Sequence, residues 1–338
     1  MTQGTTGLLP AAAWELTEER RETTWRGMRY ACRIVRGGAG ARHGGTGAGG
    51  RVAGAGRGGS EPLLLLGGAL QDMYAWPRLE RYVAPHAPLV LVDLPGSGDA
   101  DDLPAHEGFD ALADAALHLL DVLGLPRVNV LGASYGAPIA YRLAQRRPGR
   151  VARLLLAGAT HRVSGPMRVF LREAADHLER SGPTAGEALD GCADDDGRYA
   201  DRLVRYLVNT RAQERVRQSA AVQRLLRRQA LRTTWRQARR HAACHRRVLA
   251  PRLIPPGGVE GVPALVFTGE YDLTTTPEEN GAVAATVAGS RLVLIREADH
   301  MAHLECDAEY ADLVLRFLRD EPLDGLSYCD TYEAPALA

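Results

Sequence analysis

The chain has 338 residues, 45% of them hydrophobic, and its 41 basic side chains balance its 41 acidic ones. That length can bury a substantial core and suits one large α/β domain that carries an insertion. The balanced charge excludes a strongly basic, nucleic-acid-binding chain, and no segment approaches the length of a membrane span. All basic residues are arginines, so a single arginine carries less functional weight here than it would elsewhere.

Cysteine usage indicates the compartment. The cysteines are odd in number and widely scattered, at Cys32, Cys192, Cys244, Cys306 and Cys329. This pattern favours free thiols in a reducing environment over a disulfide framework. The N-terminus lacks the basic patch and apolar stretch of a signal peptide. We therefore expect a soluble, cytoplasmic protein with no membrane or nucleic-acid partner.

The first 60 residues contain few large apolar side chains. Residues 1–27 are polar and predict little regular structure, and the alternation from Met28 to Val35 predicts an edge strand. From Gly37 to Ser60 about half of the residues are glycine, which indicates disorder. A phosphate-binding loop is the alternative, but this stretch lacks the terminal Lys-Ser/Thr pair and the flanking strand and helix that such a loop requires, so disorder is favoured. Residues 28–60 thus predict an edge strand followed by a disordered linker.

Short apolar runs then alternate with helical patterns, as in a parallel sheet with helices on both faces. The predicted strands are Leu63–Leu66, Leu89–Asp93, Val128–Leu131, Val151–Ala157, Pro263–Phe267 and Arg291–Ile295. The pattern predicts two core halves, residues 61–159 and 261–321, and a C-terminal tail, residues 322–338. Residues 160–260 show no strand pattern and predict a helical cap over the site.

A glycine-flanked serine lies between a predicted strand and a predicted helix. It is Ser134, in the sequence Gly132-Ala133-Ser134-Tyr135-Gly136. This G-x-S-x-G pattern is typical of a nucleophile elbow, a sharp strand-to-helix turn whose backbone leaves no room for side chains at the glycines. The pattern predicts an exposed serine nucleophile at the apex of the turn.

A serine hydroxyl needs a base, and the base needs a carboxylate that orients it. With this motif the acid follows one strand and the histidine follows the next. The acid is predicted to be Asp272, beyond the strand at 263–267, and its rival Glu270 fits a rim contact better. An acid after the preceding strand is excluded because Gly158, Ala159 and Thr160 occupy that position.

The predicted base is His300, which follows the strand at 291–295. His303 competes with it, but Glu305 stands at the fifth position after His300, the usual arrangement around such a base. We therefore expect His303 to pack at the start of the last helix.

The oxyanion of the reaction needs two backbone N–H donors. The amide of Tyr135 is predicted to supply one and the amide of Ala69, after the strand at 63–66, the other, with Leu70 as the alternative. Gly68, Leu70 and Met301 are the predicted substrate contacts. No cofactor and no metal ligand is predicted.

These segments, taken in order, resemble the α/β-hydrolase fold from about residue 61 to 320, the cap excepted. The matching pieces are LLGGA, DLPGSG, LGASYG, TGEYD and ADHMAHLE. Gly67 stands where many members have histidine, which leaves open how the oxyanion loop is braced. Within this superfamily, GGAL, TGEYDLTTTPEE and ADHMAHLE also resemble the acyltransferase that builds 3-hydroxyacyloxy-acid lipids for rhamnolipids.

The predicted cap is rich in arginine from Arg202 to Arg252. Such a field could attract an anionic substrate, the acidic surface of an acyl carrier protein or the phosphates of coenzyme A. A solvated helical face explains it equally well. His241, Cys244 and His245 match no standard zinc spacing.

The leading hypothesis is a cofactor-independent serine hydrolase that acts on a small-molecule ester or thioester. The alternative is an acyltransferase that moves an acyl group from an acyl carrier protein or coenzyme A thioester to a hydroxyl. A binding protein that kept the fold without the chemistry is a third hypothesis, and it predicts that Ser134→Ala leaves the biological effect intact.

Overall fold

The structure is a computed structural model that describes residues 15–38, 61–180 and 193–333. The glycine-rich stretch from residue 39 to 60 and Cys192 lie outside these described residues. The four cysteines within them are free and buried. No described helix is long and apolar enough to cross a membrane.

The described strands form a single sheet. They are β1 (Leu16–Trp25), β2 (Met28–Gly37), β3 (Leu63–Leu66), β4 (Leu89–Asp93), β5 (Val128–Ala133), β6 (Val151–Ala157), β7 (Ala264–Gly269), β8 (Arg291–Ile295) and β9 (Cys329–Glu333). Their order across the sheet is β1-β2-β4-β3-β5-β6-β7-β8-β9. The strands from β3 to β8 are parallel, and β1, β2 and β9 add antiparallel pairs at the two sides.

Two features at the sides of the sheet differ from the sequence expectation. The strand predicted at Met28–Val35 is not an edge strand, because β1, in the segment expected to lack regular structure, pairs with β2 along its whole length. The expected C-terminal tail contains β9, which pairs with β8. Most residues of β1 and β9 are exposed or half-buried, so neither strand carries the apolar pattern that identifies a core strand.

Helices cover both faces of the sheet. The core helices are α1 (Pro77–Val83), α2 (Phe109–Val122), α3 (Ala137–Arg146), α8 (Pro277–Ala284), α9 (Ala302–Glu305) and α10 (Asp307–Leu318). Alternate residues of β3 point to opposite faces: Leu64 packs in the core with α2, α3 and α8, and Leu65 packs in the core with α1, α9 and α10. The α/β class and the mostly parallel sheet with helices on both faces are therefore confirmed.

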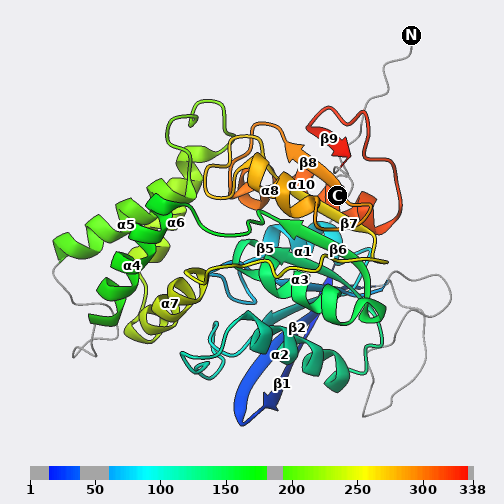
Figure 1. Ribbon diagram of the computed structural model, residues 1–338, viewed down its shortest axis with the longest axis horizontal. Helices are drawn as coiled ribbons and strands as arrows, with labels where there is room; N and C mark the ends of the chain where they lie inside the picture. The colour runs from blue at the N-terminus through cyan, green and yellow to red at the C-terminus, as the bar shows by residue number, and fades with distance from the viewer. Residues whose placement is uncertain (1–14, 39–60, 181–192, 334–338) are drawn as a thin grey trace.

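Between β6 and β7 the described chain is helical. This insertion contains α4 (Gly165–Arg180), α5 (Ala193–Leu207), α6 (Ser219–Leu231) and α7 (Trp235–Val248). Figure 1 shows the four helices together at one side of the sheet. Phe170 of α4 stacks on Tyr206 of α5, with ring centroids 4.2 Å apart, so aromatic packing joins two of them.

Candidate active site

The loops that follow the parallel strands meet at one edge of the sheet, because the carboxyl ends of parallel strands lie side by side. Ser134 directly follows β5, Asp272 lies three residues after β7, and His300 lies five residues after β8. The loop after β3 carries Ala69. The fold thus brings together four segments that are far apart in the sequence.

The turn at Ser134 requires its two glycines. A Cβ atom on Gly136 would lie 2.0 Å from the carbonyl oxygen of Leu66, and one on Gly132 would lie 2.5 Å from the carbonyl oxygen of Gly136. Ser134 itself has a positive φ of 49°, a strained conformation for a residue with a side chain. The strand, the close turn and α3 together hold the hydroxyl at the apex.

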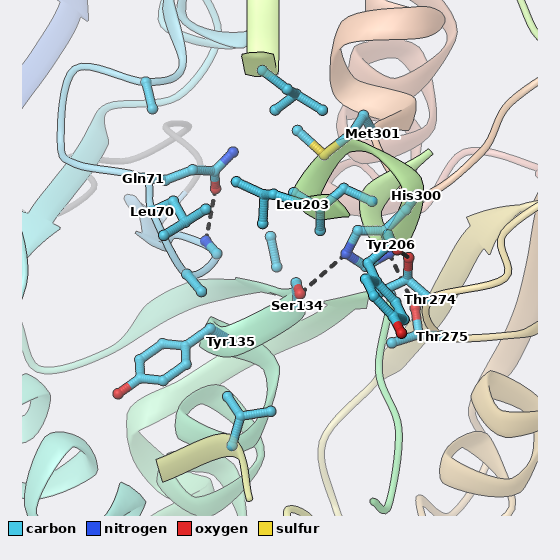
Figure 2. Close-up of a pocket in the computed structure, with 18 of the residues that line it drawn as sticks. Leu70, Gln71, Ser134, Tyr135, Leu203, Tyr206, Thr274, Thr275, His300 and Met301 are labelled. Carbon is cyan, nitrogen blue, oxygen red and sulfur yellow. Dashed lines mark hydrogen bonds between the residues drawn. The ribbon is translucent and has the colours of Figure 1, made fainter. Parts of the chain in front are cut away.

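The hydroxyl of Ser134 is directed toward the ring of His300 (Figure 2). The Oγ atom of Ser134 lies 3.2 Å from Nε2 of His300, and Nδ1 of the same ring lies 2.9 Å from Oδ2 of Asp272. The side chain of Asp272 is completely buried and that of His300 is 5% exposed. The three side chains form one hydrogen-bonded chain, in which Asp272 and most of the His300 side chain are buried and Ser134 is half-buried.

Asp272 is fixed by more than His300. Its Oδ2 atom accepts hydrogen bonds from the hydroxyls of Thr268 and Thr275, and its Oδ1 atom accepts from the amides of Thr274 and Thr275. The sequence interpretation missed these threonines, although the run from Thr274 to Thr276 beside an aspartate is a signal for a turn around a carboxylate.

The surroundings of Asp272 and His300 determine the protonation states of these two side chains. Burial opposes ionisation of Asp272, but the charge of His300 and the hydrogen bonds to the carboxylate outweigh it and lower the pKa of Asp272. Burial also disfavours charged His300, but the Asp272 carboxylate outweighs this effect and raises the pKa of His300. Asp272 is therefore ionised near neutral pH, and His300 is a stronger base than a free imidazole.

Neither rival residue takes the place of Asp272 or His300. Glu270 lines a separate cavity with Arg217 and Arg296. His303 lines the same cavity as Ser134, but its tilted ring packs against Trp76 with ring centroids 4.4 Å apart, and the hydrogen bond to the Ser134 hydroxyl comes from His300. A Cβ atom at Gly158 would lie 3.2 Å from Cε1 of His300, so the alternative acid position after β6 leaves little room for a side chain beside this ring.

The loop after β3, which carries Ala69, is braced by a residue that the sequence interpretation missed. The amide of Gly68 donates to Oε1 of Gln71 over 2.7 Å, and Nε2 of Gln71 lies 3.0 Å from Nε2 of His303. Burial and the nearby charges of His300 and Arg78 lower the pKa of His303 to about 3. His303 is therefore neutral, and its Nε2 atom can accept a hydrogen bond from the Gln71 amide.

This brace occupies the space beside Gly67, where a Cβ atom would lie 3.4 Å from Cβ of Gln71 and 3.5 Å from Nε1 of Trp76. It leaves the two predicted oxyanion donors free. In the described residues, the Ala69 amide, in the turn after β3, forms no hydrogen bond, and the Tyr135 amide forms none outside its own short helix. The side chain of Tyr135 is directed away from His300 (Figure 2).

Two further carboxyl groups hold the loop that carries His300. The amide of His300 donates to Oδ1 of Asp299, and the amide of Asp299 donates to Oε2 of Glu305, both over 2.7 Å. Burial is the main cause that raises the pKa of Asp299 to about 6 and that of Glu305 to about 8. Glu305 is therefore mostly protonated near neutral pH and adds little negative charge beside His300.

A cavity of about 570 Å³ lies above Ser134, between the sheet edge and the inserted helices. Gly68, Leu70 and Met301, the predicted substrate contacts, all line it. Other apolar lining residues come from α4, α5 and α6, and they are Met167, Phe170, Leu171, Leu203, Leu207, Leu225 and Leu226. The Ser134 hydroxyl thus faces a largely apolar space large enough for an acyl chain.

Many arginines of the insertion are already engaged. Arg227 pairs with Asp201, Arg246 with Asp176 and Glu179, and Arg240 with Asp102. Within the described residues no group of three or more His, Cys, Asp or Glu side chains is arranged to hold a metal ion, and this includes His241, Cys244 and His245.

Comparison with known proteins identifies the family of this chain. A sequence profile of the α/β hydrolase fold matches residues 61–307. The (R)-3-hydroxydecanoyl-ACP:CoA transacylase of Pseudomonas aeruginosa is 24% identical over 279 residues, which cover 79% of this chain and 85% of that protein. The match therefore extends over most of both chains, at a level of identity that marks a distant relationship.

A second relative is more similar over a shorter stretch. The 2-hydroxy-6-oxononadienedioate/2-hydroxy-6-oxononatrienedioate hydrolase 2 of Pseudomonas putida is 35% identical over 105 residues, 30% of this chain and 37% of that enzyme. The match to the (E)-2-((N-methylformamido)methylene)succinate hydrolase of Acinetobacter baylyi spans 46% of that enzyme. The chain thus covers less than half the length of these two hydrolases.

Solved structures share the fold. The enol-lactonase from Burkholderia xenovorans superposes with a TM-score of 0.68 at 21% identity, covering 88% of this chain and 100% of that one. A thermophilic esterase from Thermogutta terrifontis superposes with a TM-score of 0.65 at 22% identity, covering 89% and 98%. At these identities the likeness establishes the architecture and not the substrate.

Proposed function

We propose that this chain, which belongs to the α/β-hydrolase-fold family, is a serine hydrolase that cleaves a carboxylic ester or thioester through an acyl-enzyme on Ser134. The observation that carries the proposal is the hydrogen-bonded chain from Ser134 through His300 to buried Asp272. It lies beneath an apolar cavity, as an acyl-transfer site requires.

In the acylation step His300 Nε2 takes the proton of the Ser134 hydroxyl while Oγ attacks the carbonyl carbon of the substrate. The amides of Ala69 and Tyr135 stabilise the oxygen that becomes negatively charged. His300 then returns its proton to the leaving alcohol or thiol as the carbon–oxygen or carbon–sulfur bond breaks.

Deacylation repeats the sequence with water. His300 takes a proton from water, the resulting hydroxide attacks the acyl-enzyme, and the proton passes to Ser134 as the acid leaves. Asp272 orients the His300 ring and stabilises its charged form in both steps. The pKa directions of this pair support these roles, since the acid stays ionised and the histidine gains basicity.

A second candidate is an acyltransferase, in which a hydroxyl replaces water in the second step. It is favoured by the relative named a transacylase, which aligns with 79% of this chain. Both candidates form the same acyl-enzyme, so the acceptor distinguishes them. With an acyl carrier protein or coenzyme A thioester as the donor and a hydroxyl compound as the acceptor, a transferase yields a new ester and the free thiol. A hydrolase yields the free acid instead of the ester.

The test is turnover of a panel of p-nitrophenyl esters and acyl thioesters of increasing chain length. We expect the wild-type protein to release acid or new ester from part of the panel and Ser134→Ala to release neither. If Ser134→Ala turned over the panel at the wild-type rate, the proposal would be wrong. A Ser134→Ala variant that kept the full biological effect would instead favour the binding-protein hypothesis.

A further inference from the structure

The cavity above Ser134 has a charged end. Its charged lining residues, among those the structure describes, are Arg228 and Arg232 at the C-terminal end of α6 and Asp72 in the loop after β3. The other arginines of the insertion do not line this cavity. Most of the arginine field therefore faces elsewhere, and two members of it share a space with the proposed nucleophile.

Among the described residues, these two guanidinium groups have no partner. Both residues are exposed, as Arg224 is, and neither forms a side-chain hydrogen bond or ion pair within the described part of the chain, whereas neighbouring Arg227 binds Asp201 over 2.7 Å. Asp72 accepts a hydrogen bond from the amide of Tyr74 and contacts neither arginine. Like charges four residues apart on a helix repel each other, so an anion bound between them would be stabilised.

The position of α6 separates this charged end from the reacting atoms. Gln218, just before the helix, donates to the carbonyl oxygen of Glu305, and Leu226 packs against Met301 beside His300. Arg232 follows Leu226 by six residues, which corresponds to roughly 9 Å along a helix. A substrate whose carbonyl reaches Ser134 could thus extend along α6 to the guanidinium groups.

Helix α7 continues the polar lining. Its residues Gln237, His241 and His245 are spaced four apart, so they lie on one helix face, and all three line the cavity. Neither histidine forms a hydrogen bond, and Nδ1 of His245 is buried without a partner. Burial lowers the pKa of His241 to about 4 and that of His245 to about 3, so both rings are neutral hydrogen-bonding groups.

We propose that Arg228 and Arg232 form a subsite for an anionic group of the substrate, a carboxylate or a phosphate, at the end of the cavity remote from Ser134. The polar face of α7 lines the path to it. The inference rests on the proposed function, because it assumes that Ser134 marks the reacting end. It makes the substrate amphipathic: an apolar acyl segment over Ser134 and a negative charge at the α6 end.

The test compares matched substrates. One pair, p-nitrophenyl octanoate and the p-nitrophenyl hemiester of suberate, differs by a terminal carboxylate on the acyl chain. The other pair, octanoyl-pantetheine and octanoyl-4′-phosphopantetheine, differs by a phosphate on the leaving group. We expect kcat/KM to favour the anionic member of one pair by roughly tenfold, the size of one or two charge-assisted hydrogen bonds at a partly exposed site. The pair that shows this preference in kcat/KM identifies the group that binds the two arginines, a carboxylate on the acyl chain or a phosphate on the leaving group.

In the double variant Arg228→Gln/Arg232→Gln this preference should disappear while turnover of the neutral members stays at the wild-type level. Arg224→Gln is the matched control, because Arg224 is an exposed, unpaired arginine of α6 that does not line the cavity. The preference should survive in this control and should fall with added salt. Absence of any anion preference, or its persistence in the double variant, would overturn the subsite.

A binding experiment separates failure of the subsite from failure of the proposed function. Calorimetry on Ser134→Ala with suberic acid monoamide against octanamide, and with 4′-phosphopantetheine against pantetheine, needs no turnover. Tighter binding of one anionic ligand that depends on the two arginines supports the subsite even if no ester is cleaved. Equal binding within both pairs would refute it even if neutral esters are good substrates.

Discussion

The side-chain amide of Gln71 lies 3.0 Å from Nε2 of His303, a residue 232 positions later in the chain. Through its carbonyl oxygen the same side chain holds the amide of Gly68, next to the proposed oxyanion donor Ala69. This contact holds the loop that follows β3. The oxyanion loop is therefore tied to the segment that carries His300.

Replacing Gln71 by alanine tests this link. The Gly68 amide loses its acceptor and the loop loses its connection to His303, so the oxyanion donors are held less rigidly in the transition state. We expect kcat to fall by about tenfold with little change in KM, because an interaction made mainly in the transition state is weakened. Gln213→Ala, at an exposed position of the insertion, is the control. Unchanged kcat in Gln71→Ala would show that the loop needs no brace.

The pH dependence of activity follows from the Asp272–His300 pair. The base must be neutral, so kcat/KM should rise with pH through the pKa of His300, which the Asp272 carboxylate raises above the ordinary value of 6.5. Asp272→Asn removes the charge that raises this pKa. The rising limb should then move to lower pH, and the maximal rate should fall on the order of a thousandfold, since the ring loses its orienting partner. If the rising limb of the kcat/KM profile of Asp272→Asn stays at the wild-type pH, Asp272 is not the partner that raises the pKa of His300.

The raised pKa of Glu305 makes the free energy of unfolding depend on pH. Its pKa is raised from 4.5 to about 8 in the folded protein, mainly by burial. Between these values the unfolded chain loses a proton that the folded chain retains, so stability falls as pH rises through this window. Glu305→Gln has no such proton and keeps an oxygen that can accept from the Asp299 amide. The Tm of this variant relative to wild type should therefore increase from about pH 5 to pH 8. Parallel Tm profiles would contradict the raised pKa.

The turn at Ser134 predicts a large steric effect. In Gly136→Ala the new methyl group would lie 2.0 Å from the carbonyl oxygen of Leu66, so β3 and the elbow would have to separate. We expect a loss of several kcal/mol in the free energy of unfolding, measured by denaturant titration, or failure to fold. Gly149→Ala is the matched control, because its added Cβ meets no atom within 4 Å. Equal stability of the two variants would contradict the close packing of the elbow.

The parts of the fold that sequence could predict are those with local signals. Leu63–Leu66 is apolar throughout and Val151–Ala157 is apolar except for the half-buried Arg153, because both faces of these strands are largely buried, and both segments coincide with observed strands. Ser134, Asp272 and His300 could be chosen because each follows a strand in the order that the motif implies. The structure brings these three side chains together, and their catalytic roles stay a proposal.

Other parts depend on contacts that no local pattern encodes. β1 carries charged residues on an exposed edge, and its strand conformation comes from pairing with β2. The brace between Gln71 and His303 joins residues from two distant loops and required the tertiary structure. Which arginines face the cavity likewise depends on how α6 and α7 pack, since the density of arginines is high along the whole insertion.

The most direct test of the central claim is labelling with a fluorophosphonate, followed by peptide mapping. The reagent forms a bond to a serine oxygen only when a base activates the hydroxyl, so it reports on Ser134 and His300 together. We predict one adduct on the peptide that contains Ser134, its absence in Ser134→Ala, and a strongly reduced rate in a folded His300→Gln variant. A folded wild-type protein without an adduct on Ser134, or with labelling that does not depend on His300, would contradict the proposed mechanism.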